Sequence, residues 1–199
     1  MANDALGCRL ESRGEVLDED RELVRVAWHD TDAAGRLYDK YYSAIFGYIL
    51  HCTFDHAVTE DLTSNVFLAA FGHLRRFQWQ RVPFGAWLYR IATNEVRMHY
   101  RRARRAGALR LEDRARSQET APAASEQPAA AEERRLLHEA LLALKLKYRT
   151  AIVLRYFEDK TIAEISEITG RRPGTVKSQL HRGLAQLQDI LLRHGVLPQ

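Results

Sequence analysis

Apolar residues recur at three- and four-residue steps along most of the chain, and no stretch alternates between apolar and polar residues as a β-strand would. This spacing predicts amphipathic helices whose apolar faces pack against one another. Before residue 106 it predicts a short helix around Glu22 to Trp28, a helix over 37–50, one that begins near Asp55 and one that begins at Pro83. The apolar faces of the three longer helices comprise Leu37, Tyr38, Tyr41, Tyr42, Ile45, Phe46, Ile49 and Leu50; Leu62, Val66, Ala69, Ala70 and Leu74; and Phe84, Trp87, Leu88, Ile91 and Ala92.

The composition changes between Ala106 and Ala131, where Ala, Glu, Gln, Ser and Pro dominate and large apolar residues are almost missing after Leu111. Such a segment buries too little apolar surface to fold, which predicts a flexible linker. Two more apolar stripes follow it: Leu136, Leu137, Ala140, Leu141 and Leu144; and Ile152, Val153, Tyr156 and Phe157. We therefore predict an all-α protein with two small helical domains, over 20–105 and 133–195, joined by a flexible linker over 106–132.

The second domain contains the pattern of a helix-turn-helix. Thr161 and Glu164 have the spacing of a capping box, Gly170 stands where that helix would end, and Pro173 can begin the next helix. The apolar side of that next helix comprises Val176, Leu180, Leu184, Leu187 and Leu191, and its outward side comprises Thr175, Lys177, Ser178, Gln179, His181 and Arg182. A DNA major groove about 12 Å wide admits a helix of this kind. An ordinary helical hairpin is the competing interpretation.

A basic stripe ends the helix that begins at Pro83. Arg97, Arg101 and Arg104 share one face of it, and His99, Arg102 and Arg105 flank that face. Such a stripe can follow a phosphate backbone. A solvated helix end is the alternative, because the helix dipole favours cations there by roughly 0.3 to 1 kcal/mol without any ligand.

Aromatic and basic residues are interleaved around the start of the same helix: Phe77, Trp79, Phe84 and Trp87 alternate with Arg75, Arg76, Arg81 and Arg90. Surfaces of this composition bind single-stranded bases by stacking. Phe84 and Trp87 fall at core-facing positions, where simple packing is the better interpretation. Trp79 stands among polar neighbours and is predicted to be the exposed ring.

Composition narrows the class of protein. With 46% hydrophobic and 28% charged residues the chain is globular, and no apolar run approaches the roughly 20 residues that span a bilayer. The first 20 residues lack the apolar run of a signal peptide, so we expect a cytoplasmic protein without membrane insertion. The formal charge of +4 permits a polyanionic partner.

No catalytic or metal-binding pattern is recognisable in the sequence. Cys8 and Cys52 are far apart, and we expect His51 and His56 beside Cys52 to be surface or core residues rather than ligands. A nucleophile elbow, a metal-spaced set of His and acidic residues and a P-loop are all missing. We therefore expect no enzymatic activity, no metal and no cofactor.

Two stretches resemble the extracytoplasmic-function (ECF) sigma factors of bacteria. The first runs from Asp61-Leu62 through Val66-Phe67-Leu68 to Phe84-Gly85-Ala86-Trp87-Leu88-Tyr89-Arg90-Ile91-Ala92 and Asn94, and is similar to their promoter-melting domain. The second comprises Val153 to Phe157, Ala163 to Ile165 and Gly174 to Arg182, and is similar to their promoter-binding helix-turn-helix domain. Together the two matches cover most of residues 20–193.

The resemblance implies specific partners for the first domain. Its contact with core RNA polymerase would involve Asp61, Leu62, Val66, Phe67 and Leu68. Its contact with the minus-ten promoter element, where a base of the single-stranded non-template strand would be flipped out, would involve Trp79, Arg81, Trp87, Arg90, Asn94, Arg97, Arg101, Arg102 and Arg104. Unstacking a base costs a few kcal/mol, and stacking on an aromatic ring returns roughly 1 to 3 kcal/mol.

For the second domain the resemblance implies recognition of duplex DNA at the minus-thirty-five element. The candidate residues are Arg171, Arg172, Thr175, Lys177, Ser178, His181 and Arg182. An anti-sigma factor is a further partner that the family implies. The inducing signal and the promoter sequences are not implied by it.

Three departures from the family pattern affect these expectations. Ser64-Asn65 replaces the usual Gln-Glu, and Met98 stands where Asp is common, which affects polymerase contacts and minus-ten preference. Arg171 and Arg172 replace an apolar residue and Ser, which removes a side-chain N-cap worth roughly 1 kcal/mol. We expect that phosphate anchoring by the two arginines substitutes for that cap.

Two alternatives belong to other classes of protein. A stand-alone helix-turn-helix regulator, with an N-terminal domain that dimerises or senses a ligand, would bind duplex DNA tightly by itself. A protein that imitates a sigma factor to titrate its inhibitor would not need DNA-facing cations. The retention of Arg97, Arg101, Arg102, Lys177 and Arg182 disfavours this last role.

Overall fold

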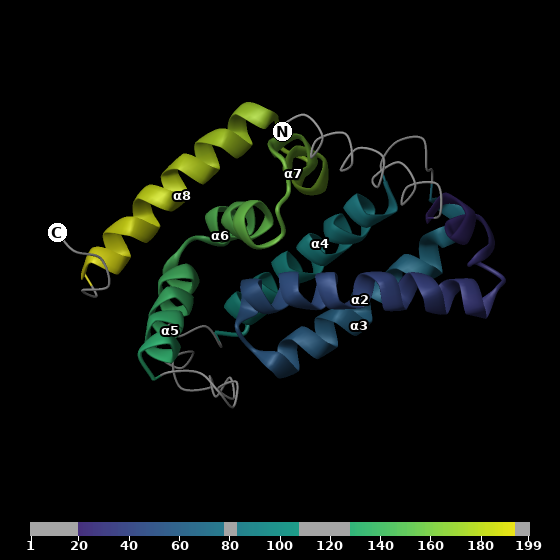
Figure 1. The fold of residues 1–199 in the computed structure, drawn as a ribbon, viewed down its shortest axis with the longest axis horizontal. Coiled ribbons are helices and arrows are strands. Elements are labelled where there is room, and N and C mark those ends of the chain that lie inside the picture. The colour runs from purple at the N-terminus through teal and green to yellow at the C-terminus, as the bar shows by residue number, and fades with distance from the viewer. Residues whose placement is uncertain (1–19, 78–82, 108–127, 194–199) are drawn as a thin grey trace, which may run out of the picture.

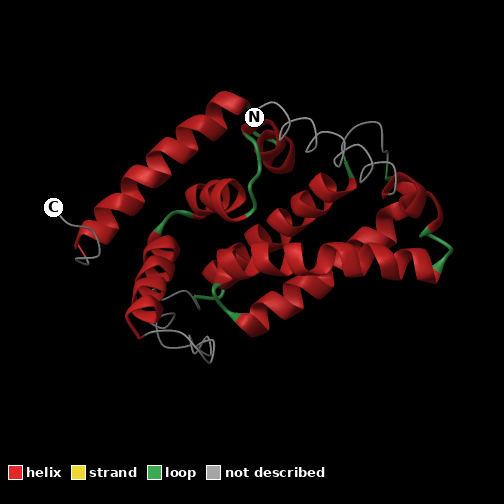
Figure 2. Cartoon of the chain, viewed as in Figure 1, coloured by secondary structure: helices red, strands yellow, loops and turns green. Residues whose placement is uncertain are grey.

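A computed structural model describes residues 20–77, 83–107 and 128–193, and within these ranges all regular secondary structure is helical (Figure 2). This confirms the all-α prediction. A helical segment over 20–26 precedes α2 (Thr31–Thr53), α3 (His56–His73), the short 3-10 turn η1 (Leu74–Arg76) and α4 (Phe84–Arg105). The C-terminal half comprises α5 (Pro128–Ala143), α6 (Leu146–Ile152), the π-helical turn η3 (Val153–Phe157), α7 (Ile162–Thr169) and α8 (Pro173–Arg193).

Side-chain caps determine where the first two long helices begin. The Asp30 carboxylate accepts from the backbone N–H groups of Asp32 and Ala33, and the Asp55 carboxylate accepts from that of Val58 at 2.9 Å. Each cap satisfies N–H groups that the first helical turn leaves without a carbonyl. Phe54 ends α2 in the left-handed conformation with φ of 53°, and this sharp reversal sends α3 back along α2.

The core of the N-terminal half lies where α2, α3 and α4 meet. It contains the predicted residues Leu37, Ile45 and Ile49, all fully buried. Tyr48 is also fully buried, and its hydroxyl forms a 2.8 Å hydrogen bond with the Thr93 hydroxyl of α4. A buried phenol needs such a partner.

The structure confirms the residues that were predicted to begin and end the first helix of the helix-turn-helix. Glu164 N donates to the Thr161 hydroxyl at 3.2 Å, and Thr161 N donates to the Glu164 carboxylate at 2.9 Å. Gly170 ends α7 with φ of 66°, which glycine adopts without steric cost. Pro173 begins α8.

Alpha8 crosses α6 at Gly183. A Cβ atom added at Gly183 would lie 3.0 Å from Ile152 Cδ1 and 3.1 Å from Tyr148 Cβ. Only a residue without a side chain allows the two helices to approach so closely. Of the predicted inward residues of α8, Val176 and Leu180 are buried, whereas Leu184 is 37% exposed. Leu187 and Leu191 are half-buried, so the apolar face of α8 is fully buried only in its N-terminal half.

The two halves of the chain pack against each other. Alpha7 packs on α4, and η3, α5 and α6 pack on α2, so that the C-terminal half lies along the N-terminal bundle (Figure 1). Buried apolar residues of the two halves form one continuous cluster. The predicted linker over 106–132 falls largely outside the described residues. However, α5 already begins at Pro128, because proline suits a first helical position and the following Ala and Glu favour helix.

Arg149 of α6 joins the halves through a buried polar contact. Its side chain is 3% exposed, and Nη1 donates to the Cys52 carbonyl at 2.7 Å and to the Tyr100 hydroxyl at 2.8 Å. The Tyr100 hydroxyl in turn donates to the same carbonyl at 3.0 Å. Nη2 of Arg149 donates to the carbonyls of Leu142 and Leu144 within its own half. One guanidinium thus links α6 to α2 and α4.

An aromatic contact near this link includes a histidine, His138, whose pKa is lowered. His138 of α5 packs on Phe54 at the end of α2, with ring centroids 4.3 Å apart. Burial, with smaller contributions from the nearby charges of His51 and Arg134, lowers the pKa of His138 to about 4. Burial also lowers the pKa of His51.

These depressed pKa values predict acid sensitivity. Because free histidine titrates near 6.5, the unfolded chain takes up protons between about pH 6.5 and 4 that the folded chain does not. The contribution of neutral His138 to the free energy of unfolding is fully present above pH 6.5 and is lost as the pH falls toward 4. Urea denaturation should give a free energy of unfolding about 1 kcal/mol lower at pH 5 than at pH 7, allowing for solvent screening of this partly exposed ring. A His138→Phe variant should lose much of that difference, and an undiminished difference would contradict the assignment.

Candidate nucleic-acid and polymerase interfaces

The five α3 residues assigned to polymerase contact divide into two groups. Leu62, Val66 and Phe67 are buried, so their side chains hold α3 in the bundle and cannot themselves form a contact surface. Asp61 and Leu68 are exposed, Leu68 by 72%. Covering one leucine side chain contributes about 2 kcal/mol to association. The candidate docking surface is therefore reduced to Asp61 and Leu68 on the outer face of α3.

Alpha4 bears the cationic surface that the sequence predicts. Arg101, Arg102 and Arg104 are exposed near its C-terminal end, and Asn94 is exposed about two to three turns earlier. Three guanidinium groups in the last two turns are favoured by the negative end of the helix dipole and are available to phosphates. This arrangement fits contact with a nucleic-acid backbone.

The aromatic cluster at the start of α4 is mostly a packing feature. Trp87 is half-buried, with its ring centroid 4.8 Å from that of Phe77 and 5.7 Å from that of Phe84. The Trp87 ring therefore packs against Phe77 and Phe84, in agreement with the core-facing position expected for it. Trp79 and Arg81, which were assigned to contact with the minus-ten element, lie outside the described residues.

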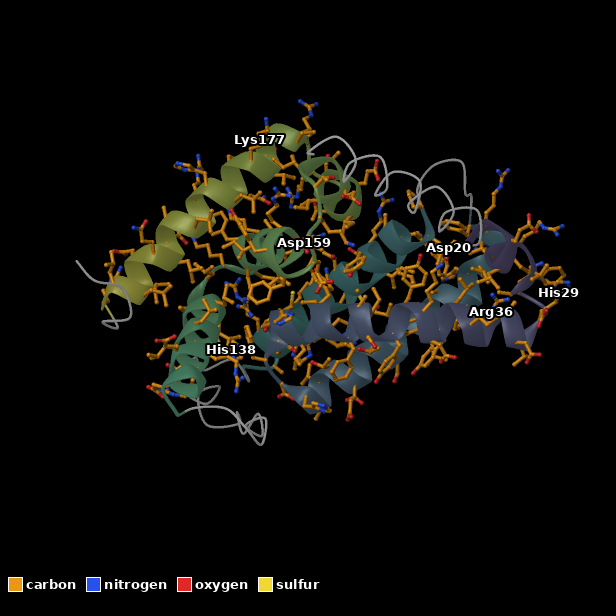
Figure 3. All side chains as sticks on the ribbon, viewed as in Figure 1. Asp20, His29, Arg36, His138, Asp159 and Lys177 are labelled. Carbon is orange, nitrogen blue, oxygen red and sulfur yellow. The ribbon has the colours of Figure 1, made fainter. Side chains whose placement is uncertain are left out.

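The outward face of α8 presents the predicted minus-thirty-five residues. Arg171, Arg172, Lys177, Ser178, His181 and Arg182 are exposed, and Thr175 is half-buried. Figure 3 shows Lys177 near the N-terminal end of α8. The backbone N–H groups of Thr175 and Val176 donate to the Arg172 carbonyl at 2.8 and 3.1 Å, so the hydrogen bonding of α8 starts at Arg172.

The two candidate DNA surfaces adjoin each other in this arrangement. Burial, and to a smaller extent the charge of Arg171, lowers the pKa of Arg97. Arg90 of α4 donates from Nη2 and Nε to the Glu167 carbonyl of α7, at 2.6 and 3.2 Å. Arg90, which was assigned to the minus-ten element, is thus hydrogen-bonded to the first helix of the helix-turn-helix.

Further residues at this junction were not anticipated from the sequence. The Tyr89 hydroxyl donates to the Glu158 carboxylate at 2.5 Å, and Lys160 Nζ lies 4.6 Å from the centre of the Tyr89 ring. Burial raises the pKa of Glu158, whereas the Tyr89 hydrogen bond lowers it. The spacing of apolar residues does not indicate that Tyr89 and Glu158 pair, because the pairing depends on how two segments 69 residues apart pack together.

Within the described ranges no group of three or more His, Cys, Asp or Glu residues could hold a metal ion. None of the helices described is long and apolar enough to cross a membrane.

Two family models match the chain in sequence order. Residues 37–106 match the model described as sigma-70 region 2, and residues 134–187 match the model described as sigma-70, region 4. The first range runs from Leu37 within α2 to the end of α4, and the second runs from the middle of α5 through about the first two thirds of α8. The two matched regions therefore correspond to the two halves of the structure.

Several named relatives extend over both regions. The ECF RNA polymerase sigma factor BldN of Streptomyces coelicolor is 32% identical over 175 residues, covering 85% of this chain and 65% of that protein. SigE of Mycolicibacterium smegmatis is 34% identical over 140 residues, covering 68% of this chain and 52% of that protein. SigL of Mycobacterium tuberculosis is 30% identical over 160 residues, covering 80% and 89%. The chain thus spans less than two thirds of the length of BldN and SigE, and most of SigL.

Two solved structures share the fold. CnrH, determined in complex with the cytosolic domain of CnrY, aligns with a TM-score of 0.66 at 23% identity, covering 87% of this chain and 97% of that chain. The sigma factor RpoE, determined in complex with the anti-sigma factor NepR from Bartonella quintana, aligns with a TM-score of 0.59 at 22% identity, covering 79% and 95%.

Proposed function

The chain belongs to the ECF RNA polymerase sigma factors, and we propose that it binds core RNA polymerase, directs it to promoters through two DNA elements and melts the minus-ten region. The observation that carries this proposal is the ordered match to sigma-70 regions 2 and 4 over residues 37–106 and 134–187. The exposed arginines of α4 and the exposed polar face of α8 support it.

The proposed division of roles follows the surfaces. Asp61 and Leu68 of α3 contact the polymerase. Arg101, Arg102 and Arg104 of α4 hold the DNA backbone beside the minus-ten element, and the outward face of α8 enters the major groove at the minus-thirty-five element. Arginine-backbone contacts position the protein, while side chains such as Ser178 and His181 can contact base edges.

Melting in this proposal is driven by binding energy alone. Capturing an extruded base returns roughly 1 to 3 kcal/mol per stacked ring, which offsets the few kcal/mol that unstacking costs. The chain therefore needs no catalytic residues or cofactor of its own. We place its action in the cytoplasm, where RNA polymerase works, and we propose an anti-sigma protein as a regulatory partner because RpoE, a structural neighbour, was determined with one.

DNA binding in this scheme requires the two halves to separate at least locally. Arg90 directs Nε and Nη2 to the Glu167 carbonyl, so these two groups must leave α7 before they can donate to a phosphate. Two DNA elements that lie apart on a promoter also cannot both be met by surfaces held against each other through Tyr89 and Glu158. We propose that binding to polymerase supplies the free energy for this opening.

Recovery of genomic DNA fragments by the chain together with core polymerase tests the proposal. Sequencing should reveal two motifs at a fixed spacing that core polymerase alone does not enrich. Recovery of the same fragments by the chain without polymerase would instead favour the stand-alone regulator. Equal recovery with and without the chain would reject both.

The basic stripe of α4 yields a quantitative prediction. An Arg101→Ala, Arg104→Ala variant should bind promoter DNA as holoenzyme with a weaker salt dependence, because each lost phosphate contact lowers the slope of log K against log salt by about 0.9. The expected decrease is thus about 1.8, measured by fluorescence anisotropy between about 0.05 and 0.2 M salt. Both side chains are exposed, so thermal unfolding should be unchanged. An unaltered slope would mean that the two arginines do not contact DNA phosphates and are simply solvated at the end of the helix.

A further inference from the structure

Two histidines from opposite halves of the chain lie where the C-terminal half packs on the end of α2. His51 belongs to α2 and packs on Phe157 of η3, with ring centroids 4.4 Å apart. His138 belongs to α5 and packs on Phe54, which follows α2 directly. Figure 3 shows His138 on α5 beside the N-terminal bundle. Each histidine thus contacts an aromatic ring of the other half, and both contacts exist only while the halves are packed together.

The environment of both rings favours the neutral imidazole. His51 and His138 are half-buried. Burial lowers the pKa of His51, although the Gly47 carbonyl partly opposes this, and burial together with the charge of His51 lowers the pKa of His138 to about 4. An imidazole in water titrates near 6.5. Each ring therefore takes up a proton more readily when the halves are apart than when they are packed.

The charges of the surrounding elements do not compensate a proton on either ring. The charged and titratable groups there are Arg134 and Glu139 on α5, Arg149 on α6, Glu158 after η3, His99 on α4, and His56 with Glu60 on α3. The carboxylates among them have partners, which are Arg135 for Glu139, Tyr89 for Glu158 and His56 for Glu60. A proton on His51 or His138 therefore adds to the positive charges of Arg134 and Arg149.

Packing of the halves at the two histidines also limits access to the candidate DNA surfaces. The elements η3, α5 and α6 pack on α2, and α7 packs on α4, where Arg90 donates to the Glu167 carbonyl. These contacts belong to one continuous interface. A loss of packing free energy at His51 and His138 thus lowers the total free energy that opposes release of α7 from α4.

We propose that His51 and His138 form a proton-sensitive switch, in which protonation of either ring shifts the chain from a packed form, with the halves in contact, toward a separated form. The inference rests on the proposed function for its consequence, since the separated form is the one that we expect to bind polymerase and promoter DNA. The switch changes the packing of the halves on each other and not the helices themselves.

The direction of the pH effect follows from the two neutral rings. Their contribution to the packed form is fully present above about pH 6.5 and is lost as the pH falls toward 4. For His138 we expect the ratio of packed to separated chains to fall about fivefold between pH 7 and pH 5, allowing for solvent screening of a half-buried ring. His51 adds to this decrease, so acid favours separation.

The first experiment measures the separation of the halves in the full chain as a function of pH. Fluorophores are attached at Ser64→Cys on α3 and Gln188→Cys on α8, two exposed positions, in a chain that also carries Cys8→Ser. Cys52 should not be labelled, because it is fully buried and burial raises the pKa of its thiol to about 12.

Single-molecule energy transfer in this labelled chain should show the ratio of packed to separated chains falling about fivefold or more from pH 7 to pH 5. The helical signal in circular dichroism should stay unchanged over the same range. A constant ratio would overturn the proposal. A ratio that falls only together with the helical signal would also overturn it, because the protons would then be taken up by unfolding.

Two pairs of variants assign the pH dependence to these rings. His51→Phe with His138→Phe keeps an aromatic ring at each position but removes the titrating groups, so the ratio should hardly change with pH. His73→Phe with His181→Phe removes two histidines from exposed positions on α3 and α8 outside this interface, and it should keep the full dependence. The same pH dependence in both pairs would contradict the proposal.

A permanent charge tests the consequence at constant, neutral pH. His138→Lys places a cation at the interface and should shift the chain toward the separated form, as circular dichroism verifies that it folds. Its Kd for core polymerase should be about fivefold lower than that of the unaltered chain, because less free energy is needed for opening. Energy transfer equal to that of the unaltered chain would overturn the switch. If energy transfer responds as expected but neither chain binds core polymerase, the proposed sigma function fails and the switch stands.

Discussion

Replacing Arg149 with leucine is expected to lower the free energy of unfolding by about 3 kcal/mol, a size typical of breaking a buried polar network from one side. The variant leaves the carbonyls of Leu142 and Leu144 without this donor and removes the guanidinium that joins α6 to Cys52 and Tyr100. Leucine preserves apolar contacts but supplies no donor, so the buried carbonyls keep their desolvation cost. Urea denaturation followed by circular dichroism measures the loss.

A milder variant separates the two consequences of that change. Tyr100→Phe removes only the two hydroxyl contacts, one with Arg149 Nη1 between the halves and one with the Cys52 carbonyl within the N-terminal half, and it leaves the Leu142 and Leu144 contacts intact. It should cost about 1 kcal/mol, as for an ordinary hydrogen bond. If Arg149 joins the halves as the structure indicates, the double variant should lose less than the sum of the single losses. Additive losses, or an Arg149→Leu variant as stable as the unaltered chain, would show that the contact does not form in solution.

Replacing Lys177 and Arg182 together with alanine is expected to reduce promoter-directed transcription about 30- to 100-fold. Both side chains are exposed on the outward face of α8, and losing a DNA contact typically costs about 1 to 3 kcal/mol. Because neither residue belongs to the core or to the α3 surface, unfolding and affinity for core polymerase should not change. Initial transcription rates at limiting holoenzyme measure the effect.

The matched control for that variant is Arg135→Ala with Arg193→Ala, which removes two positive charges from exposed positions of α5 and α8 outside the proposed DNA face. It should transcribe within about twofold of the unaltered chain, since the exposed ion pairs of Arg135 with Glu132 and of Arg193 with Asp189 contribute little to stability. A similar decline in both variants would mean that overall charge, and not the recognition face, carries the effect.

Elements governed by local rules were predictable from the sequence. The Thr161–Glu164 capping box, the left-handed Gly170 and the buried Leu37, Ile45 and Ile49 all follow from short-range spacing, and the structure confirms them. The prediction was less accurate for Leu184, which is 37% exposed although Leu187, farther along the same apolar stripe, packs against the core. Periodicity specifies a face but not the length over which another helix covers it.

Features that depend on distant segments were not predictable. In the sequence, nothing distinguishes Arg149 from the other charged residues. In the structure it is buried, and it donates to two carbonyls of its own half, to the Cys52 carbonyl and to the Tyr100 hydroxyl. Gly183 gives no local turn signal, because its role arises only where α8 crosses Ile152.

The candidate sites were predicted by family resemblance more than by chemistry. The exposure of Arg101, Arg104 and Lys177 agrees with the assigned roles. The burial of Val66 and Phe67 shows that a family motif mixes contact residues with residues that only hold the helix in place. Resemblance does not separate these two groups, whereas the packing of α3 does.

The central claim is that this chain confers promoter specificity on a polymerase that lacks it. Run-off transcription on the recovered genomic fragments, with core polymerase, with and without the chain, tests it most directly. The account predicts transcripts of defined length that appear only when the chain is present and start a fixed distance downstream of the shared motif. Transcripts that are identical with and without the chain would contradict it.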